Sequence, residues 1–326
     1  MDNINITGKN YSGGLISNSY NTSSTDINAS NVTVYSTGQY VGGIIAYKEY
    51  RNGYNTYNYT GHNMTITGVT DVGGLFGYGG CYNASIYDST ITGINGGNYL
   101  GGIGGRESYE TDNTQLVKNC TITGTGNYVG GLYGWARHYY NGQVIDTTVT
   151  QTNSAKTYVG GAFGYQDGYT HSNIGLNNVT VTNAGDYTGG ITGRLNGGGA
   201  VTYSYASNVT VNGRNYVGGV AGSATTARLY YNVVNAKVTG SGDYVGGAFG
   251  YISSVHATDS SYSAVVYELL VANSVVTGNN YVGGFVGSTK DSQITPAKFY
   301  NIILVADVTA NTTSDIYAGA INGLTS

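Results

Sequence analysis

The sequence predicts an all-β chain wound into a right-handed parallel β-solenoid. Three observations predict this fold: a glycine phrase that returns at a nearly constant interval, a β-branched phrase at a fixed distance before it, and no helical period. The clearest copy of the glycine phrase reads Tyr128-Val129-Gly130-Gly131-Leu132-Tyr133-Gly134. A period of about 20–50 residues is typical of repeat architectures, in which each repeat contacts only its neighbours.

The copies of the glycine phrase set the expected size of the array. The second glycine stands at positions 14, 43, 74, 102, 131, 161, 190, 219, 247 and 284, and a degenerate copy ends in Ala320. We therefore expect about eleven coils of ~29 residues, with three short strands per coil. They form one domain over residues 1–326, expected to be a fragment of a longer array. Two longer repeats predict inserted loops near 253–270 and 288–300.

Each repeat is expected to place three strands around a buried core. In Thr121-Ile122-Thr123, the β-branched residue between two threonines is typical of a strand with one buried face. In the glycine phrase we expect Val129 to point inward and Tyr128 outward, while the glycines let the backbone bend or approach its neighbour closely. A variable third strand follows, and the coil is expected to be right-handed because parallel β-crossovers almost always are.

An Asn or Asp recurs four residues before the last Thr of the β-branched phrase. These residues adopt the left-handed conformation readily and therefore suit a repeated corner, and stacked amides can form a hydrogen-bonded ladder. The members are Asn3, Asn31, Asn63, Asp88, Asn119, Asp146, Asn178, Asn208, Asn235 and Asn273.

Composition excludes several classes of protein. The chain has 54 Gly, 34 Tyr, only 9% charged residues and a net charge of −4. Nucleic-acid binding needs clustered Lys and Arg, which are missing, and no apolar window is long enough to predict membrane insertion. The two cysteines, Cys81 and Cys120, predict neither a disulfide framework nor a thiolate metal site. No signal peptide is recognisable at the N-terminus.

The phrase Tyr-Val-Gly-Gly-Leu-x-Gly, preceded by Asn-x-x-Val-Thr-Gly, resembles the GLUG-motif repeats of large bacterial surface proteins. The match covers about residues 3–323. The resemblance implies a secreted or cell-surface β-solenoid that acts as a stalk or adhesive rod. The chain departs from that pattern in its many tyrosines.

The first candidate site is a column of outward tyrosines, interrupted only by Asp71. Rings repeated in every coil either stabilise one edge of the solenoid by stacking or form a platform for sugar rings or a partner protein. The candidate ligand-binding residues are Tyr99, Tyr128, Tyr158, Tyr187, Tyr216 and Tyr244.

The second candidate site is a double column of threonines in five consecutive coils. It resembles the flat face of ice-binding solenoids, but Thr is also favoured in any exposed strand. The members are Thr65, Thr67, Thr90, Thr92, Thr121, Thr123, Thr148, Thr150, Thr180 and Thr182.

The sequence does not predict an enzyme. The four histidines share no repeat position, and the acidic residues are too dispersed for paired-carboxylate catalysis or a regular Ca²⁺ site. We therefore expect no catalytic residues, no metal and no cofactor. N-x-Ser/Thr sequons, such as Asn178-Val179-Thr180, are either chance matches or glycan acceptors.

These patterns predict an extracellular structural or adhesive rod, with glycan or protein binding on the tyrosine column and a capacity for fibre formation. The alternative is an ice-binding solenoid that uses the threonine columns. Expected partners are glycans, surface proteins, or further copies of the chain through end-to-end or lateral association, because exposed coil ends present unpaired strands.

Overall fold

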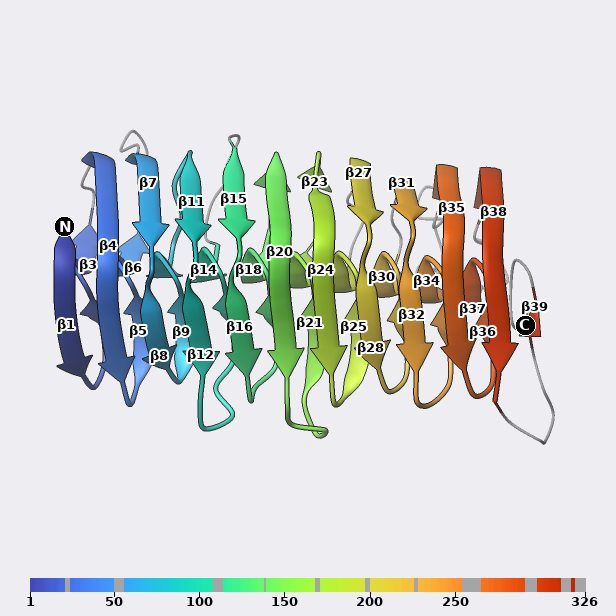
Figure 1. Cartoon of the computed structure of the whole chain (residues 1–326), viewed down its shortest axis with the longest axis horizontal. Coiled ribbons are helices and arrows are strands. Elements are labelled where there is room, and N and C mark those ends of the chain that lie inside the picture. The colour runs from blue at the N-terminus through green and yellow to red at the C-terminus, as the bar shows by residue number, and fades with distance from the viewer. Residues whose placement is uncertain are drawn as a thin grey trace, which may run out of the picture.

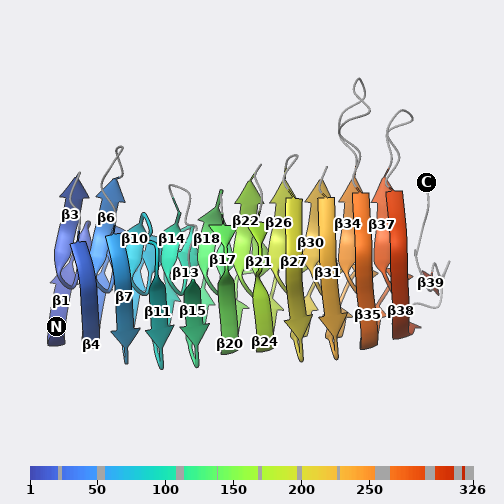
Figure 2. The same cartoon turned by 90° about the horizontal axis from the view of Figure 1, so that it is seen from above.

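The computed structural model describes residues 1–20, 24–49, 56–107, 114–137, 139–167, 171–196, 200–225, 228–253, 265–290, 298–311 and 318–319. All regular elements in these residues are strands, which pair in parallel into three sheets along the molecule (Figures 1 and 2). In Figure 1 the chain descends along the near face and returns along the far face while it advances from left to right. The coil is therefore right-handed, and the predicted parallel β-solenoid is confirmed.

The first sheet forms the near face in Figure 1 and has 18 strands. Its strands are β1 (Asp2–Gly8), β4 (Ser24–Ser36), β7 (Thr56–His62), β8 (Thr65–Gly68), β11 (Ala84–Tyr87), β12 (Thr90–Gly93), β15 (Gln115–Lys118), β16 (Thr121–Gly124), β19 (Tyr139–Tyr140), β20 (Gly142–Gln151), β23 (His171–Ser172), β24 (Gly175–Asn183), β27 (Ala200–Ser207), β28 (Thr210–Gly213), β31 (Arg228–Val234), β32 (Lys237–Gly240), β35 (Val265–Gly278) and β38 (Lys298–Ala310).

The second sheet has 11 strands, and each comes from one copy of the glycine phrase. Its strands are β2 (Ser12–Gly13), β5 (Gln39–Gly42), β9 (Thr70–Gly73), β13 (Leu100–Gly101), β17 (Val129–Gly130), β21 (Thr157–Gly160), β25 (Asp186–Gly189), β29 (Val217–Gly218), β33 (Val245–Gly246), β36 (Val282–Gly283) and β39 (Ala318–Gly319).

The third sheet has 10 strands, which follow the glycine pairs. Its strands are β3 (Ile16–Tyr20), β6 (Ile45–Glu49), β10 (Phe76–Tyr78), β14 (Gly104–Arg106), β18 (Tyr133–Ala136), β22 (Phe163–Asp167), β26 (Thr192–Asn196), β30 (Ala221–Thr225), β34 (Phe249–Ser253) and β37 (Val286–Lys290).

The core is a set of columns that keep strict register from coil to coil. Ile122 pairs with Ile91 on one side and with Val149 on the other, and all three are fully buried. The valine of the glycine phrase forms a second buried column, for example Val129 beside Val159. Because side chains alternate along a strand, these inward columns leave the Thr and Tyr columns on the outside. The predicted inward and outward positions are confirmed.

The arrangement of three strands differs from the prediction in one respect. The glycine pair ends one strand and precedes another in a different sheet, as β17 and β18 show. The variable strand, such as β11, instead joins the same sheet as the Thr-Ile-Thr strand and lies in line with it. The sequence could not distinguish these arrangements because both place alternate residues in the core.

The paired glycines are required by close approach of neighbouring coils. A Cβ on Gly131 would lie 1.9 Å from the carbonyl oxygen of Gly161, and one on Gly161 would lie 2.2 Å from that of Gly190. Positive φ is not the reason, since among the described glycines only Gly79 and Gly96 have it. The expectation of close approach is confirmed.

The predicted Asn corner is confirmed in both conformation and hydrogen bonding. All ten members have φ between 50° and 56°. Several donate a side-chain N–H to the neighbouring coil, such as Asn63 to Asn31 at 2.6 Å and Asn178 to Asp146 at 2.7 Å. The ladder therefore ties adjacent coils together at the corner that joins the two halves of the first sheet.

The two stretches predicted to hold inserted loops begin and end in strands. Within 253–270, the residues from Val265 onward belong to β35, and Ser253 ends β34. Within 288–300, both ends belong to β37 and β38. The remaining residues, 254–264 and 291–297, lie outside the described residues.

Candidate functional site

The outward tyrosines form a continuous stack of rings along the edge between the second and third sheets. From Tyr99 to Tyr281 they are in contact coil by coil. The centroid distances are 5.0 Å for Tyr99–Tyr128, 5.3 Å for Tyr128–Tyr158, 5.1 Å for Tyr158–Tyr187, 4.6 Å for Tyr187–Tyr216, 4.8 Å for Tyr216–Tyr244 and 4.8 Å for Tyr244–Tyr281. The six predicted site residues thus lie together in what we call the tyrosine ladder.

Stacking limits how the tyrosine ladder can bind. Ring planes within a pair differ by only 4–7° in most steps, such as Tyr216–Tyr244 at 4°. The faces of inner rings are therefore covered by their neighbours, so a sugar ring cannot stack on them. Ring edges remain for a ligand, and each ring is half-buried. The stabilising role of the rings and a binding role for their edges are compatible.

Four of the ladder hydroxyls, those of Tyr128, Tyr187, Tyr216 and Tyr244, have a raised pKa and stay protonated at physiological pH. Burial raises the pKa of Tyr216 to about 12, with smaller contributions from nearby tyrosines. Burial also raises the pKa of Tyr128, Tyr187 and Tyr244. A ligand on this edge therefore meets polar, uncharged groups.

The ladder tyrosines hold a backbone conformation that the sequence did not reveal. Tyr128 has φ 64° and Tyr158 has φ 68°, in the left-handed region, and the other members share it. This conformation is unfavourable for a bulky side chain. Stacking on the rings of two neighbouring coils offsets this conformational cost. The tyrosine residue therefore itself makes the turn at this corner of the coil.

A second asparagine ladder, missed in the sequence, lies immediately before the tyrosines. Asn127 accepts the backbone N–H of Thr157 at 2.8 Å, and Asn215 accepts that of Asp243 at 2.8 Å. Asp186 in turn accepts from Arg214 Nε at 2.8 Å. The Asn or Asp that recurs directly before the ladder tyrosine could have indicated this second ladder. Its hydrogen bonds hold the backbone on which the tyrosine rings stand.

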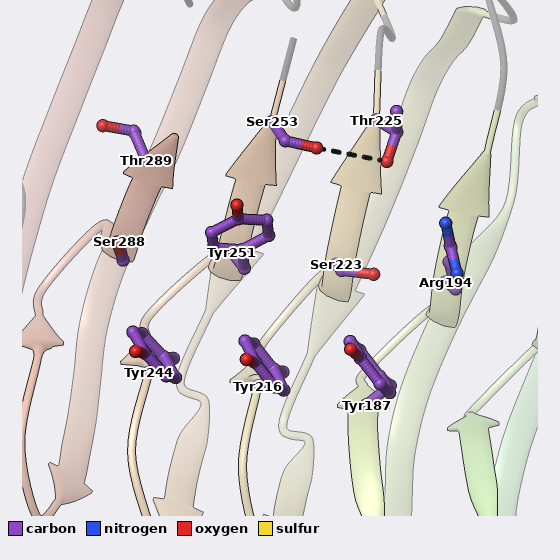
Figure 3. Close-up of a pocket in the computed structure, with 10 residues that line it drawn as sticks. All are labelled: Tyr187, Arg194, Tyr216, Ser223, Thr225, Tyr244, Tyr251, Ser253, Ser288 and Thr289. Atoms are coloured by element: carbon purple, nitrogen blue, oxygen red, sulfur yellow. Dashed lines mark hydrogen bonds between the residues drawn. The ribbon is translucent and has the colours of Figure 1, made fainter. Parts of the chain in front are cut away.

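A groove opens beside the C-terminal half of the tyrosine ladder (Figure 3). It has a volume of about 430 Å³. Tyr187, Tyr216 and Tyr244 line one side, and residues of β26, β30, β34 and β37 line the other. Only the three ladder tyrosines were predicted. Four of the remaining lining residues, Arg194, Ser223, Tyr251 and Ser288, each stand four residues after the second glycine of their repeat, so the sequence pattern could have grouped them.

The predicted threonine columns also lie together. Thr90 pairs with Thr65 and Thr121, and Thr148 pairs with Thr121 and Thr180. Their strands, β8, β12, β16, β20 and β24, are neighbours on the near face in Figure 1. The face is an in-register array of hydroxyls and methyls. Thr65, Thr90, Thr121 and Thr148 are exposed, and the other six threonines are half-exposed.

The titratable side chains of the described residues do not gather into a candidate metal site. They contain no group of three His, Cys, Asp or Glu side chains that could hold a metal ion. His62 stacks on Tyr87 with a centroid distance of 4.6 Å, while His138 and His256 lie outside the described residues. Both cysteines are buried free thiols. In the part of the chain described, no helix is suited to cross a membrane.

Comparisons with protein-family models, curated proteins and solved structures give no match for this chain. The chain is a β-solenoid repeat protein with an aromatic edge, a groove beside that edge and an in-register threonine face.

Proposed function

We propose that this chain is an extracellular or cell-surface structural and adhesive rod, the stalk or repeat region of an adhesin-like protein. The observation that carries the proposal is the tyrosine ladder, which presents the same half-exposed ring edge in successive coils. A periodic row of uncharged hydroxyl-bearing edges suits multivalent contact with glycans or surface proteins, in which weak contacts add through avidity. The resemblance to GLUG-motif repeats supports the same reading.

The solenoid also suits a load-bearing spacer. Each coil is hydrogen-bonded to the next through three sheets and two asparagine ladders. Such arrays derive stability from neighbouring repeats and keep a fixed direction along their axis. End-to-end association would extend the rod into a fibre, and among the described strands β38 pairs on one side only, with β35.

An array of glycans and surface proteins tests the adhesive part of the proposal. We expect the intact chain to bind at least one immobilised ligand, and Tyr128→Ala or Tyr158→Ala to abolish that binding. Binding that persists in both variants would remove the tyrosine ladder as the adhesive surface. If no ligand binds, the rod is a passive spacer.

A second candidate function, ice binding, is favoured by one observation. The ten predicted threonines form two in-register columns over five neighbouring coils. Thermal hysteresis of the purified chain is the measurement, with Thr121→Tyr and Thr148→Tyr as variants. Hysteresis that disappears in both variants would support this function, and none in the wild type would end it.

A further inference from the structure

A second column of side chains accompanies the tyrosine ladder on the third sheet, four residues after each second glycine. Its members are Asn18, Tyr47, Tyr78, Arg106, Trp135, Tyr165, Arg194, Ser223, Tyr251 and Ser288. From Tyr47 to Arg194 every member is large, and the column then alternates between serine and tyrosine. Arg194 pairs with Ser223, Ser223 with Tyr251, and Tyr251 with Ser288. The groove exists because two large side chains are replaced by serines here.

The two serines carry hydroxyls that the protein itself does not satisfy. Ser223 is 4% exposed and Ser288 is 5% exposed. Within the described residues neither hydroxyl has a hydrogen-bond partner in the protein. Both serines line the groove, so a ligand there can take the place of water on the two hydroxyls.

Tyr251 stands between these serines with a ring that does not belong to the ladder stack. Its plane makes angles of 77° with Tyr216 and 74° with Tyr244. Figure 3 shows this ring face-on, above the ladder rings that are seen nearly edge-on. The two neighbours of Tyr251 in its column, Ser223 and Ser288, are small. The ring of Tyr251 is one of the side chains that line the groove.

The chemistry of the lining selects a polyhydroxylated ligand. The groove is lined by four tyrosines, three serines, two threonines and Arg194, so every residue but one carries a hydroxyl, and none is a carboxylate. Arg194 donates from Nη1 to the Tyr158 hydroxyl at 3.2 Å, and its Nε is buried without a partner. The volume lies within the ~300–1,000 Å³ typical of small-molecule sites.

We propose that this groove binds a sugar residue of a glycan, with the ring against Tyr251 and its hydroxyls bonded to Ser223 and Ser288. The inference deepens the proposed adhesive function and depends on it, because it assigns the glycan to one stretch of the aromatic edge. Sugar rings combine apolar C–H faces with equatorial hydroxyls. A tyrosine ring beside hydroxyls that line the same groove matches both features.

The test is glycan binding by the full chain, using an array of glucose-, mannose-, galactose- and galacturonate-containing oligosaccharides, followed by calorimetry on the best ligand. Ser223→Tyr fills the groove with a side chain that the same column carries at Tyr165 and Tyr251, so the variant is expected to fold. Tyr251→Ser removes the aromatic surface. Each should weaken binding at least about tenfold, which corresponds to about 1.4 kcal/mol. Tyr165→Ser is the control, since this residue lies outside the groove, and its affinity should stay within about twofold.

The outcomes separate this site from the wider proposal. Loss of binding in Ser223→Tyr and Tyr251→Ser, with Tyr165→Ser unchanged, supports the groove. Wild-type affinity in both groove variants shows that the groove is not the glycan site. If Tyr128→Ala nevertheless abolishes binding, the tyrosine ladder remains the adhesive surface and only the groove proposal is wrong. A groove that binds none of the oligosaccharides holds only water, and the inference is wrong even if the rod adheres to proteins.

Discussion

Arg106 and Asp71 form a two-point ion pair where the tyrosine column is interrupted. Nε lies 2.5 Å from Oδ1, and Nη2 lies 2.8 Å from Oδ2. Asp71 is 1% exposed and takes the corner position that tyrosine holds in neighbouring coils. The guanidinium carbon lies 4.6 Å from the ring centroid of Tyr99. A planar cation thus fills the place of the missing ring and neutralises the buried carboxylate.

Replacing Arg106 should destabilise the rod strongly. In Arg106→Gln the Asp71 carboxylate stays buried without its counter-ion, which costs on the order of 3 kcal/mol at pH 7. Urea denaturation measures the loss. The matched control is Arg214→Gln, because the Arg214–Asp186 pair is more exposed, at 43% and 22% of the side-chain surfaces. Its loss should be below about 1 kcal/mol. Equal losses would show that the buried ion pair contributes no more to the free energy of unfolding than the exposed pair.

The same carboxylate predicts a pH dependence of stability. Burial raises the pKa of Asp71 to about 6, although Arg106 opposes the shift. The folded protein therefore takes up a proton near pH 6 that the unfolded chain takes up only near 3.8. This group stabilises the fold increasingly as the pH falls from 6 toward 4, and the contribution is lost as the pH rises through 6.

Asp71→Asn isolates that dependence. The free energy of unfolding of the wild type should rise relative to the variant as the pH falls from 7 to 4, measured by urea titration at each pH. A wild type that instead loses stability relative to Asp71→Asn over this range would place the pKa below the ordinary value. The ionised pair would then be the stabilising form.

The paired glycines should not accept even a methyl group. Gly131→Ala places Cβ against the backbone of the next coil, at 1.9 Å from the Gly161 oxygen, and should cost about 1–3 kcal/mol or more. Gly93→Ala is the control, since its nearest contacts are 3.4 Å to Leu100 and 3.7 Å to Gly124. Thermal unfolding should show a large drop for the first and little change for the second. Similar drops would mean that backbone flexibility, and not space, selects the glycine pair.

Two substitutions at one corner asparagine should separate the energetic contribution of its backbone conformation from that of its hydrogen bond. Asn119 has φ 54° and donates to Asp88 at 2.5 Å. Asn119→Gly and Asn119→Ala both remove that bond, but only alanine must adopt the left-handed conformation with a Cβ. Alanine should therefore cost about 1–2 kcal/mol more than glycine in chemical denaturation. Equal stabilities would assign the whole effect to the ladder bond.

Much of the fold could be predicted because the same residue types recur at the same positions in successive repeats. The Ile and Val columns, the Asn corner and the outward tyrosines each follow from side-chain period and local conformation. The placement of the variable strand could not be predicted, because alternation gives a buried face in either sheet. The left-handed tyrosines were unforeseen as well, since intrinsic preference disfavours them and only stacking across coils makes them stable.

The candidate site was predicted in part. The ladder rings and threonine columns were readable because they recur at fixed positions. The groove arises instead where a recurring position departs from its pattern, at Ser223 and Ser288 beside Tyr251. The groove and the orientation of the Tyr251 ring result from packing between coils, and the sequence of one coil does not contain them. The ion pair of Asp71 with Arg106 is a similar exception, joining residues one coil apart.

Adhesion under flow tests the central claim, that the rod binds through its aromatic edge, most directly. Beads coated with the chain would be passed over a surface bearing the best ligand from the array, and retention would be measured against shear. We predict retention by wild-type beads, and loss of retention by beads carrying Tyr128→Ala with Tyr158→Ala. Because loss of the stacked rings also lowers the stability of this variant, retention is measured at a temperature at which circular dichroism shows the variant to be folded. Wild-type beads that are not retained, or variant beads retained equally well, would contradict the claim.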